Sequence, residues 1–214
     1  MEKLINIKII DYGMGNIQSV KNAFELLDCN VDIIDNPSDI HAADGIILPG
    51  VGAFGNAINN LEQKKLIDPL KDAVLNKKIP LLGICLGMQL LADSSEERGS
   101  SKGLSFISGD IRKIPEMQNY RLPHVGWNDI NIKKTDPLFK NILDKSSFYF
   151  VHSYRFECDD SYVVATTDYG QNINAVVQKE HIFGVQFHPE RSQRKGFHLI
   201  NNFIDYTKAK KDIL

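Results

Sequence analysis

The chain has 214 residues, 43% of them hydrophobic and 24% charged, and this composition predicts one globular domain over residues 1–214. Its formal net charge of −2 provides no basic field, which argues against nucleic acid as the main ligand. Three cysteines without CxxC spacing argue against a disulfide framework or a zinc cluster and fit a reducing compartment.

The first expected element is a strand. Charged residues and an asparagine interrupt the apolar residues of positions 1–8, which excludes a signal peptide and predicts a strand, buried over 5–10. A loop at 11–16 precedes a helix that begins near Asn16 and ends near Leu27. The glycines of this loop, in Gly-Met-Gly, lack the third glycine of a dinucleotide-binding motif and the lysine of a P-loop, so a phosphate site is not expected. No apolar run is long enough for a bilayer, so we expect no membrane partner and a cytoplasmic setting.

Two more strands are predicted, at 31–34 and 45–48. The second opens into a loop, PGVGAFG, at 49–55, whose three glycines leave backbone amides exposed. Such amides can stabilise an oxyanion, although an ordinary tight turn before a helix is the alternative. A helix is expected over about 56–76, interrupted or restarted near Asp68-Pro69.

The segment 79–92, IPLLGICLGMQLLA, predicts a strand, a sharp turn at Cys85 and a helix. Gly83 and Gly87 flank the cysteine, as a strained elbow requires where side chains would collide with the neighbouring strand and helix. The helix directs its positive end at the sulfur, which favours the reactive thiolate. For this short motif alone, a buried structural cysteine is the alternative.

A possible catalytic base follows a strand-like run at 182–187. His188 and Glu190 lie two residues apart at the strand's end, where alternate residues face the same side, and Pro189 ends the strand. A thiol nucleophile needs a base, and the base needs an anion that orients its ring. Since strand ends of one open sheet converge, the sequence predicts a triad of Cys85, His188 and Glu190.

The remaining segments complete the predicted fold. Short strand-like runs are expected at 109–114, 129–132 and 148–154. The segment PHVGWN at 123–128 lies between two of them, and its histidine, His124, lacks a carboxylate two residues later, so His188 is preferred as the base. The last segment, 194–210, predicts a helix with one apolar face, formed by Phe197, Ile200, Phe203 and Ile204.

The motifs ILPGVGAF, GICLGMQ and FGVQFHPE together resemble the class I (triad-type) glutamine amidotransferases, over about residues 6–204. Within that family, IDYGMGNIQSV, PHVGWN and YFVHSYR are similar to the glutaminase subunits of imidazole glycerol phosphate synthases. The expected fold is an open, mostly parallel, flavodoxin-like α/β sheet with helices on both faces and a small antiparallel addition from 104–150. The resemblance implies hydrolysis of L-glutamine without cofactor or metal, and a heterodimer with a (β/α)8 cyclase that uses the ammonia in histidine biosynthesis.

The resemblance also implies roles for individual residues. Amides that form the oxyanion hole are expected at Val51, Gly52 and Leu86. Substrate-binding residues are expected at Gln89, Glu97, His152, Ser153 and Tyr154. Glu97 would bind the α-amino group, although the adjacent Glu96 is an alternative, and a satisfied core histidine is the alternative for His152. Residues facing the partner are expected at Tyr12, Asn16, Trp127, Tyr149 and Arg191; burial in the core is the alternative for Trp127.

One departure from the family keeps other functions open. Arg191 stands where the family usually has lysine, and a planar guanidinium does not replace a compact ammonium where fit is tight. A related amidotransferase that feeds a sugar-amidating synthase for surface polysaccharide or flagellar glycan is therefore the alternative. A non-catalytic regulatory module on the same fold and a peptidase-type cysteine hydrolase are the alternatives of other classes. The complete triad argues against the module, and the HPE and PGVG motifs argue against the hydrolase.

Overall fold

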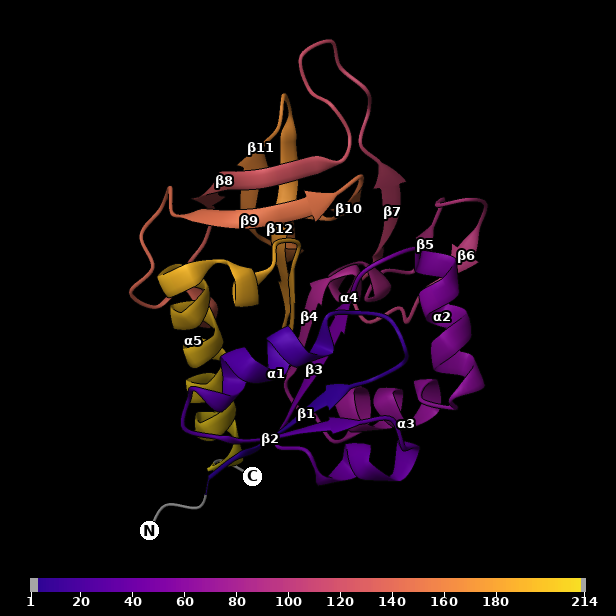
Figure 1. Ribbon diagram of the computed structural model, residues 1–214, viewed down its shortest axis with the longest axis vertical. Coiled ribbons are helices and arrows are strands. Elements are labelled where there is room, and N and C mark those ends of the chain that lie inside the picture. Colours follow the sequence, from indigo (N-terminus) through magenta and orange to yellow (C-terminus); the bar gives the residue numbers. More distant parts are fainter. Residues whose placement is uncertain (1–3, 213–214) are drawn as a thin grey trace.

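The computed structural model describes residues 4–212, and Figure 1 shows a central sheet with helices on both sides. The strands of the main sheet are β1 (Asn6–Ile10), β2 (Asn30–Ile34), β3 (Gly45–Gly50), β4 (Leu81–Cys85), β8 (His124–Ile132), β9 (Ser147–His152), β11 (Val163–Asp168), β12 (Asn172–Lys179) and β13 (Ile182–Val185). A second sheet contains β5 (Ser94–Ser95), β6 (Ser101–Lys102), β7 (Gly109–Lys113) and β10 (Tyr154–Cys158).

The main sheet has nine strands in the order β2-β1-β3-β4-β13-β12-β11-β8-β9. Strands β2 to β13 in this order pair in parallel, and the other four are antiparallel. The expected α/β fold is confirmed. Its antiparallel part exceeds the predicted segment 104–150, because β11 and β12 join it and β12 pairs directly with β13.

Helices cover both faces of the parallel strands. The α-helices are α1 (Ile17–Glu25), α2 (Phe54–Gln63), α3 (Ile67–Lys71), α4 (Leu86–Leu90) and α5 (Gln193–Lys211). Short 3-10 segments are η1 (Pro37–Ala42), η3 (Pro137–Phe139), η4 (Asp160–Tyr162) and η5 (Pro189–Arg191), and η2 (Asp72–Asn76) is a π-helix. Within residues 4–212, no helix combines the length and apolarity needed to cross a membrane.

The two helical layers form two apolar cores. Helices α1 and α5 contribute Phe24 and Phe203 to one core, and α2 and α4 contribute Phe54 and Met88 to the other. Figure 1 shows α5 and the α2/α3 pair on opposite sides of the central strands. Because both faces are covered, β3 and β4 are buried at every position, which explains their apolar sequences.

The helix predicted over about 56–76 is divided in two. The chain leaves the helix at 64–66, where Lys65 has a φ of 56°, and the restart predicted near Asp68-Pro69 is observed at Ile67, where α3 begins. Pro69 lies in the first turn of α3, where a missing N–H costs no helical hydrogen bond.

Three further segments differ in detail from their predictions. The PHVGWN segment does not separate two strands, because β8 begins at His124 and pairs with β9. On α5, Leu199 is buried, whereas Phe197 is half-buried. Residues 1–3 of the predicted first strand lie outside the described residues.

The topology brings three functional loops together. Strand β4 lies between β3 and β13, and all three run parallel. Gly50 is in register with Cys85 across β3 and β4, and Val185 is in register with Ile84 across β13 and β4. The loop after Gly50, the turn at Cys85 and the segment leading to His188 therefore leave the sheet at one edge.

Gly87 provides a test of this packing. A Cβ atom at Gly87 would lie 1.7 Å from the carbonyl oxygen of Leu48, a backbone atom of β3. We expect Gly87→Ala to lower the free energy of unfolding by about 3 kcal/mol or more in urea denaturation. Gly55→Ala is the control, because its Cβ would approach only the Ser101 hydroxyl, at 3.0 Å, and should change stability by less than about 1 kcal/mol. Equal stability of the two variants would contradict this packing.

Candidate active site

Cys85 occupies a strained turn between β4 and α4. Its φ of 54° and ψ of −109° lie outside the regions that ordinary residues favour. A Cβ at Gly83 would lie 2.7 Å from the carbonyl oxygen of Gly87, and a Cβ at Gly87 would strike the carbonyl of Leu48. The predicted collisions with the helix and with the neighbouring strand are confirmed. The two glycines therefore allow the sharp turn that places Cys85 at the edge of the sheet.

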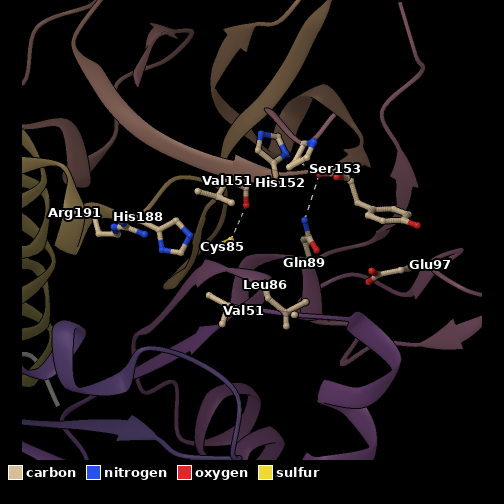
Figure 2. A pocket seen from close by; sticks show the side chains of 13 residues that line it. Val51, Cys85, Leu86, Gln89, Glu97, Val151, His152, Ser153, His188 and Arg191 are labelled. Carbon is tan, nitrogen blue, oxygen red and sulfur yellow. Dashed lines mark hydrogen bonds between the residues drawn. The ribbon is translucent and has the colours of Figure 1, made fainter. Parts of the chain in front are cut away.

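His188 and Glu190 lie beside Cys85. In Figure 2, the ring of His188 points toward the Cys85 sulfur. Its Nδ1 donates to Glu190 Oε1 at 2.8 Å, and the two side chains are only 7% and 3% exposed. The backbone N–H of His188 donates to the Tyr149 carbonyl at 2.9 Å, which ties this segment to β9. A sulfur, an imidazole and a carboxylate thus lie in the order that proton transfer requires.

The electrostatics of this group favour the charged imidazole. Burial alone would lower the pKa of His188, but its hydrogen bonds with Cys85 and Glu190, and their charges, raise it from 6.5 to about 10. This upward shift favours the imidazolium form of the ring. This form is the partner that a thiolate requires and the acid that a leaving amine requires.

A cavity of about 300 Å³ opens beside Cys85, and Figure 2 looks into it. It is lined by Val51, Gly52, Cys85, Leu86, Gln89, Glu97, Pro123, Val151, His152, Ser153, Tyr154, His188 and Arg191. All predicted oxyanion-hole and substrate-binding residues are among them, and Glu190 lies behind His188. Among residues 4–212, no group of three or more His, Cys, Asp or Glu is placed to hold a metal ion.

Val51 and Gly52, in the loop between β3 and α2, line one side of the cavity. Gly52 has a φ of +109°, and Val51 is 44% exposed. The N–H of Phe54, at the start of α2, donates to Glu97 Oε2 at 2.7 Å. The carboxylate of Glu97 thus anchors the end of the loop that begins at Pro49.

Glu97, and not Glu96, faces the cavity. Glu96 lies outside it, where it accepts hydrogen bonds from Arg112 at 2.9 Å and from the N–H of Lys113 at 2.8 Å. The sequence left these two carboxylates as alternatives. Their positions favour Glu97 as the group that could receive a substrate ammonium.

The prediction that Tyr12 faces a partner was wrong. Its side chain is fully buried, and its hydroxyl donates to the Pro49 carbonyl at 2.7 Å. Burial, and then the charge of Cys85, raise the pKa of Tyr12 above its usual range, so the hydroxyl stays protonated. The Tyr12 hydroxyl therefore holds the end of β3, from which the loop at Val51 and Gly52 begins.

The other residues predicted to face a partner lie at the surface. Trp127 is 49% exposed, and its ring packs edge-on against Tyr149 with centroids 6.1 Å apart. The guanidinium of Arg191 lies 4.7 Å from the centre of the Tyr149 ring. Arg191 also lines a small cavity with Val51 and Asn16, the exposed N-cap of α1. These residues form a continuous surface next to the catalytic cavity.

One residue of the site was missed. Gln186 is fully buried; its Nε2 donates to Cys85 Sγ at 3.8 Å, and its Oε1 accepts from Gln89 at 3.1 Å. A signal was available in the sequence, because a glutamine within the apolar run FGVQF must find buried partners. Its amide contributes a donor to the sulfur in addition to the predicted triad.

Comparison with known proteins identifies the family. The model for class I glutamine amidotransferases matches residues 8–206. "Imidazole glycerol phosphate synthase subunit HisH 2" of Vibrio vulnificus is 47% identical over 208 residues, 97% of each chain. "Imidazole glycerol phosphate synthase subunit HisH 1" of Campylobacter jejuni is 48% identical over 198 residues, 92% of this chain and 98% of that one. The chain belongs to the class I glutamine amidotransferases, in the group named HisH.

Solved structures agree with this amidotransferase fold. The structure of PurLQS from Thermotoga maritima has a TM-score of 0.73 and 18% identity, and the match covers 95% of this chain and 99% of that one. A structure titled only as a glutamine amidotransferase has a TM-score of 0.74 and 16% identity, with 94% and 98% covered. At these identities the likeness concerns the fold alone. The predicted family and enzyme class are confirmed by the sequence relatives.

Glu190→Gln tests the charge arrangement of this amidotransferase. The substitution removes the anion beside His188, so we expect the pKa of His188 to fall from about 10 toward 6.5, as measured by NMR titration of its ring protons. A folded-state pKa above the unfolded one means that this group stabilises the fold fully below pH 6.5 and loses that contribution as the pH rises through about 10. In Glu190→Gln, the stabilising contribution of His188 should be lost at a lower pH than in the wild type. Glu96→Gln, outside the cavity, is the control, and equal His188 midpoints in both variants would contradict the prediction.

Proposed function

We propose that this chain is the glutaminase subunit of an imidazole glycerol phosphate synthase and that it works with a triad of Cys85, His188 and Glu190. It hydrolyses L-glutamine to glutamate and ammonia. The observation that carries the proposal is the meeting of these three side chains beside a 300 Å³ cavity. Near 50% identity to proteins named as subunits of that synthase supports the choice of synthase.

The first half of the reaction forms a thioester. The Cys85 thiolate attacks the side-chain amide carbon of glutamine, and the carbonyl electron pair moves onto oxygen. Backbone amides of the Val51–Gly52 turn and of Leu86 stabilise this oxyanion. The His188 imidazolium transfers its proton to the amide nitrogen, the carbon–nitrogen bond breaks, and ammonia leaves.

The second half restores the enzyme. His188, now neutral, takes a proton from a water molecule, and the resulting hydroxide attacks the thioester carbon. The oxyanion collapses, the carbon–sulfur bond breaks, and the thiolate and imidazolium are regenerated as glutamate leaves. Glu190 holds the ring through Nδ1 and stabilises its positive charge throughout, which matches its buried contact of 2.8 Å.

The cavity offers complementary groups for an amino acid. The carboxylate of Glu97 would receive the α-ammonium group of glutamine. The segment 152–154 would receive the α-carboxylate through its backbone amides and the Ser153 hydroxyl. Both ring nitrogens of His152 already have protein partners, so its side chain offers no free ring nitrogen to the substrate. Gln89 completes the cavity wall between these segments.

The ammonia is used by a second protein. We infer a heterodimer with a (β/α)8 cyclase that consumes ammonia in histidine biosynthesis, in the cytoplasm. Trp127, Tyr149 and Arg191 would contact this partner, because their surface borders the cavity. Arg191 touches both the surface and the cavity, so a partner that engages it can also affect the adjacent oxyanion loop. Arg191 would also suit a sugar-amidating synthase, and the names of the relatives favour the cyclase.

Cys85→Ala tests the mechanism. We expect a loss of glutamine hydrolysis of at least about 10⁴-fold, because no thioester can form; release of glutamate is the measurement. Cys29→Ala is a matched control, since Cys29 lies beyond the cavity beside Phe24, and it should retain activity. Hydrolysis that survives in Cys85→Ala would contradict the triad.

The same assay with an added barrel cyclase should show faster glutamate release, and an unchanged rate with no complex formed would contradict the assigned partner.

A further inference from the structure

A chain of hydrogen bonds begins at the nucleophile. Gln186 Nε2 donates to Cys85 Sγ at 3.8 Å, and Gln89 Nε2 donates to Gln186 Oε1 at 3.1 Å. Gln89 Nε2 also donates to the Tyr154 carbonyl at 3.3 Å. The cavity wall is therefore connected to the backbone at the start of β10.

The chain continues from Tyr154 to strand β8. His152 Nδ1 bonds the same Tyr154 carbonyl at 2.8 Å, and its Nε2 lies 2.9 Å from His124 Nδ1. His124 Nε2 lies 3.2 Å from Asn128 Nδ2, which also donates to the Asp168 carbonyl at 2.8 Å. Two histidines thus link the glutamine cavity to the PHVGWN segment.

The direction of every bond in this part follows from the chemistry of its ends. A carbonyl oxygen only accepts, so His152 Nδ1 carries a proton. Burial lowers the pKa of His152 to about 3 and that of His124 to about 4, so each ring is neutral and has one N–H. His152 Nε2 therefore accepts from His124 Nδ1, and His124 Nε2 accepts from the Asn128 amide. One pair of tautomers satisfies the whole chain.

Packing holds His124 in this orientation. The ring is 2% exposed and lies in stacked contact with Phe150 and Tyr169, whose centroids are 4.9 Å and 4.1 Å away. His152 is 5% exposed. Loss of the His124 donor would leave His152 Nε2 buried without a partner, a state that costs more than an ordinary hydrogen bond contributes.

We propose that His124 is a positioning residue for glutamine. Acting through His152, it fixes the bend between β9 and β10 at Ser153, and with it the backbone of 152–154 that faces the cavity. This inference rests on the proposed function, in which that backbone receives the α-carboxylate. Trp127 lies three residues after His124 on strand β8, and its side chain is on the opposite, exposed face of the strand. One strand therefore connects the partner-facing surface with the substrate-facing bend.

His124→Phe and His124→Gln separate this role from simple stability. Phenylalanine keeps the stacking and removes both hydrogen bonds, whereas glutamine keeps a donor and an acceptor. The full chain is treated with 6-diazo-5-oxo-L-norleucine, a glutamine analogue that alkylates thiols, and the rate of Cys85 labelling is measured against its concentration. We expect His124→Phe to raise the half-saturating concentration about 10-fold and to change the limiting rate less than about 2-fold. His124→Gln should restore most of the loss.

A matched control and a second readout complete the test. His181 is equally buried, at 5% exposure, and bonds the Val74 carbonyl away from the cavity, so His181→Phe should leave the half-saturating concentration unchanged. Nitrogen NMR of the wild type should show His152 protonated at Nδ1 and not at Nε2. An unchanged half-saturating concentration in His124→Phe, or a proton on His152 Nε2, would overturn the proposal. A wild type that does not react at Cys85 would instead overturn the proposed function, and the tautomer measurement would still decide whether the hydrogen-bond chain exists.

Discussion

The close approach of helix α4 to strand β3 is the constraint on which the site depends. Gly87 lies against the carbonyl oxygen of Leu48 so tightly that a single methyl group would not fit. Two residues before this contact, Cys85 has a strained backbone, with a φ of 54°. The strain is stored at the residue that carries the reactive sulfur, as is common where a nucleophile must be held at a strand end. The surrounding parallel strands hold this geometry by burial on both faces.

Different elements of the fold hold the groups around the Cys85 sulfur in place. Strand β13 brings His188, whose position is tied to β9 by a backbone hydrogen bond. The loop after β3 is supported at its base by the hydroxyl of Tyr12 and at its end by the carboxylate of Glu97. Because Glu97 bonds the N–H of Phe54 and lines the cavity, one side chain links the loop to the cavity. Tyr149 also contacts Arg191, which lines the cavity, so the exposed surface around Tyr149 borders the site.

Local chemistry explains which features could be predicted from the sequence. The turn at Cys85 and the pair His188 and Glu190 were predictable, because glycine spacing and strand-end position constrain them directly. The sequence could not decide whether Glu96 or Glu97 faces the cavity, because the directions of neighbouring side chains in a loop follow no regular pattern. Tyr12 was assigned to the partner surface because the family resemblance implies that role for its loop, yet its side chain is buried against the end of β3.

Tertiary contacts account for what was missed. Cys85 lies 101 residues from its partner Gln186 along the chain, and His152 lies 28 residues from its partner His124, so no local pattern identifies these pairs. The size of the antiparallel part was underestimated for the same reason, because alternation predicts that a strand exists but not which strand it joins.

The most direct test of the meeting of Cys85, His188 and Glu190 around bound glutamine is a crystal structure of the full chain after reaction with 6-diazo-5-oxo-L-norleucine. We predict a carbon–sulfur bond at Cys85, the ring of His188 within hydrogen-bond distance of that sulfur, the ammonium at Glu97 and the carboxylate at 152–154. Modification of Cys29 or Cys158 with Cys85 left free would contradict it.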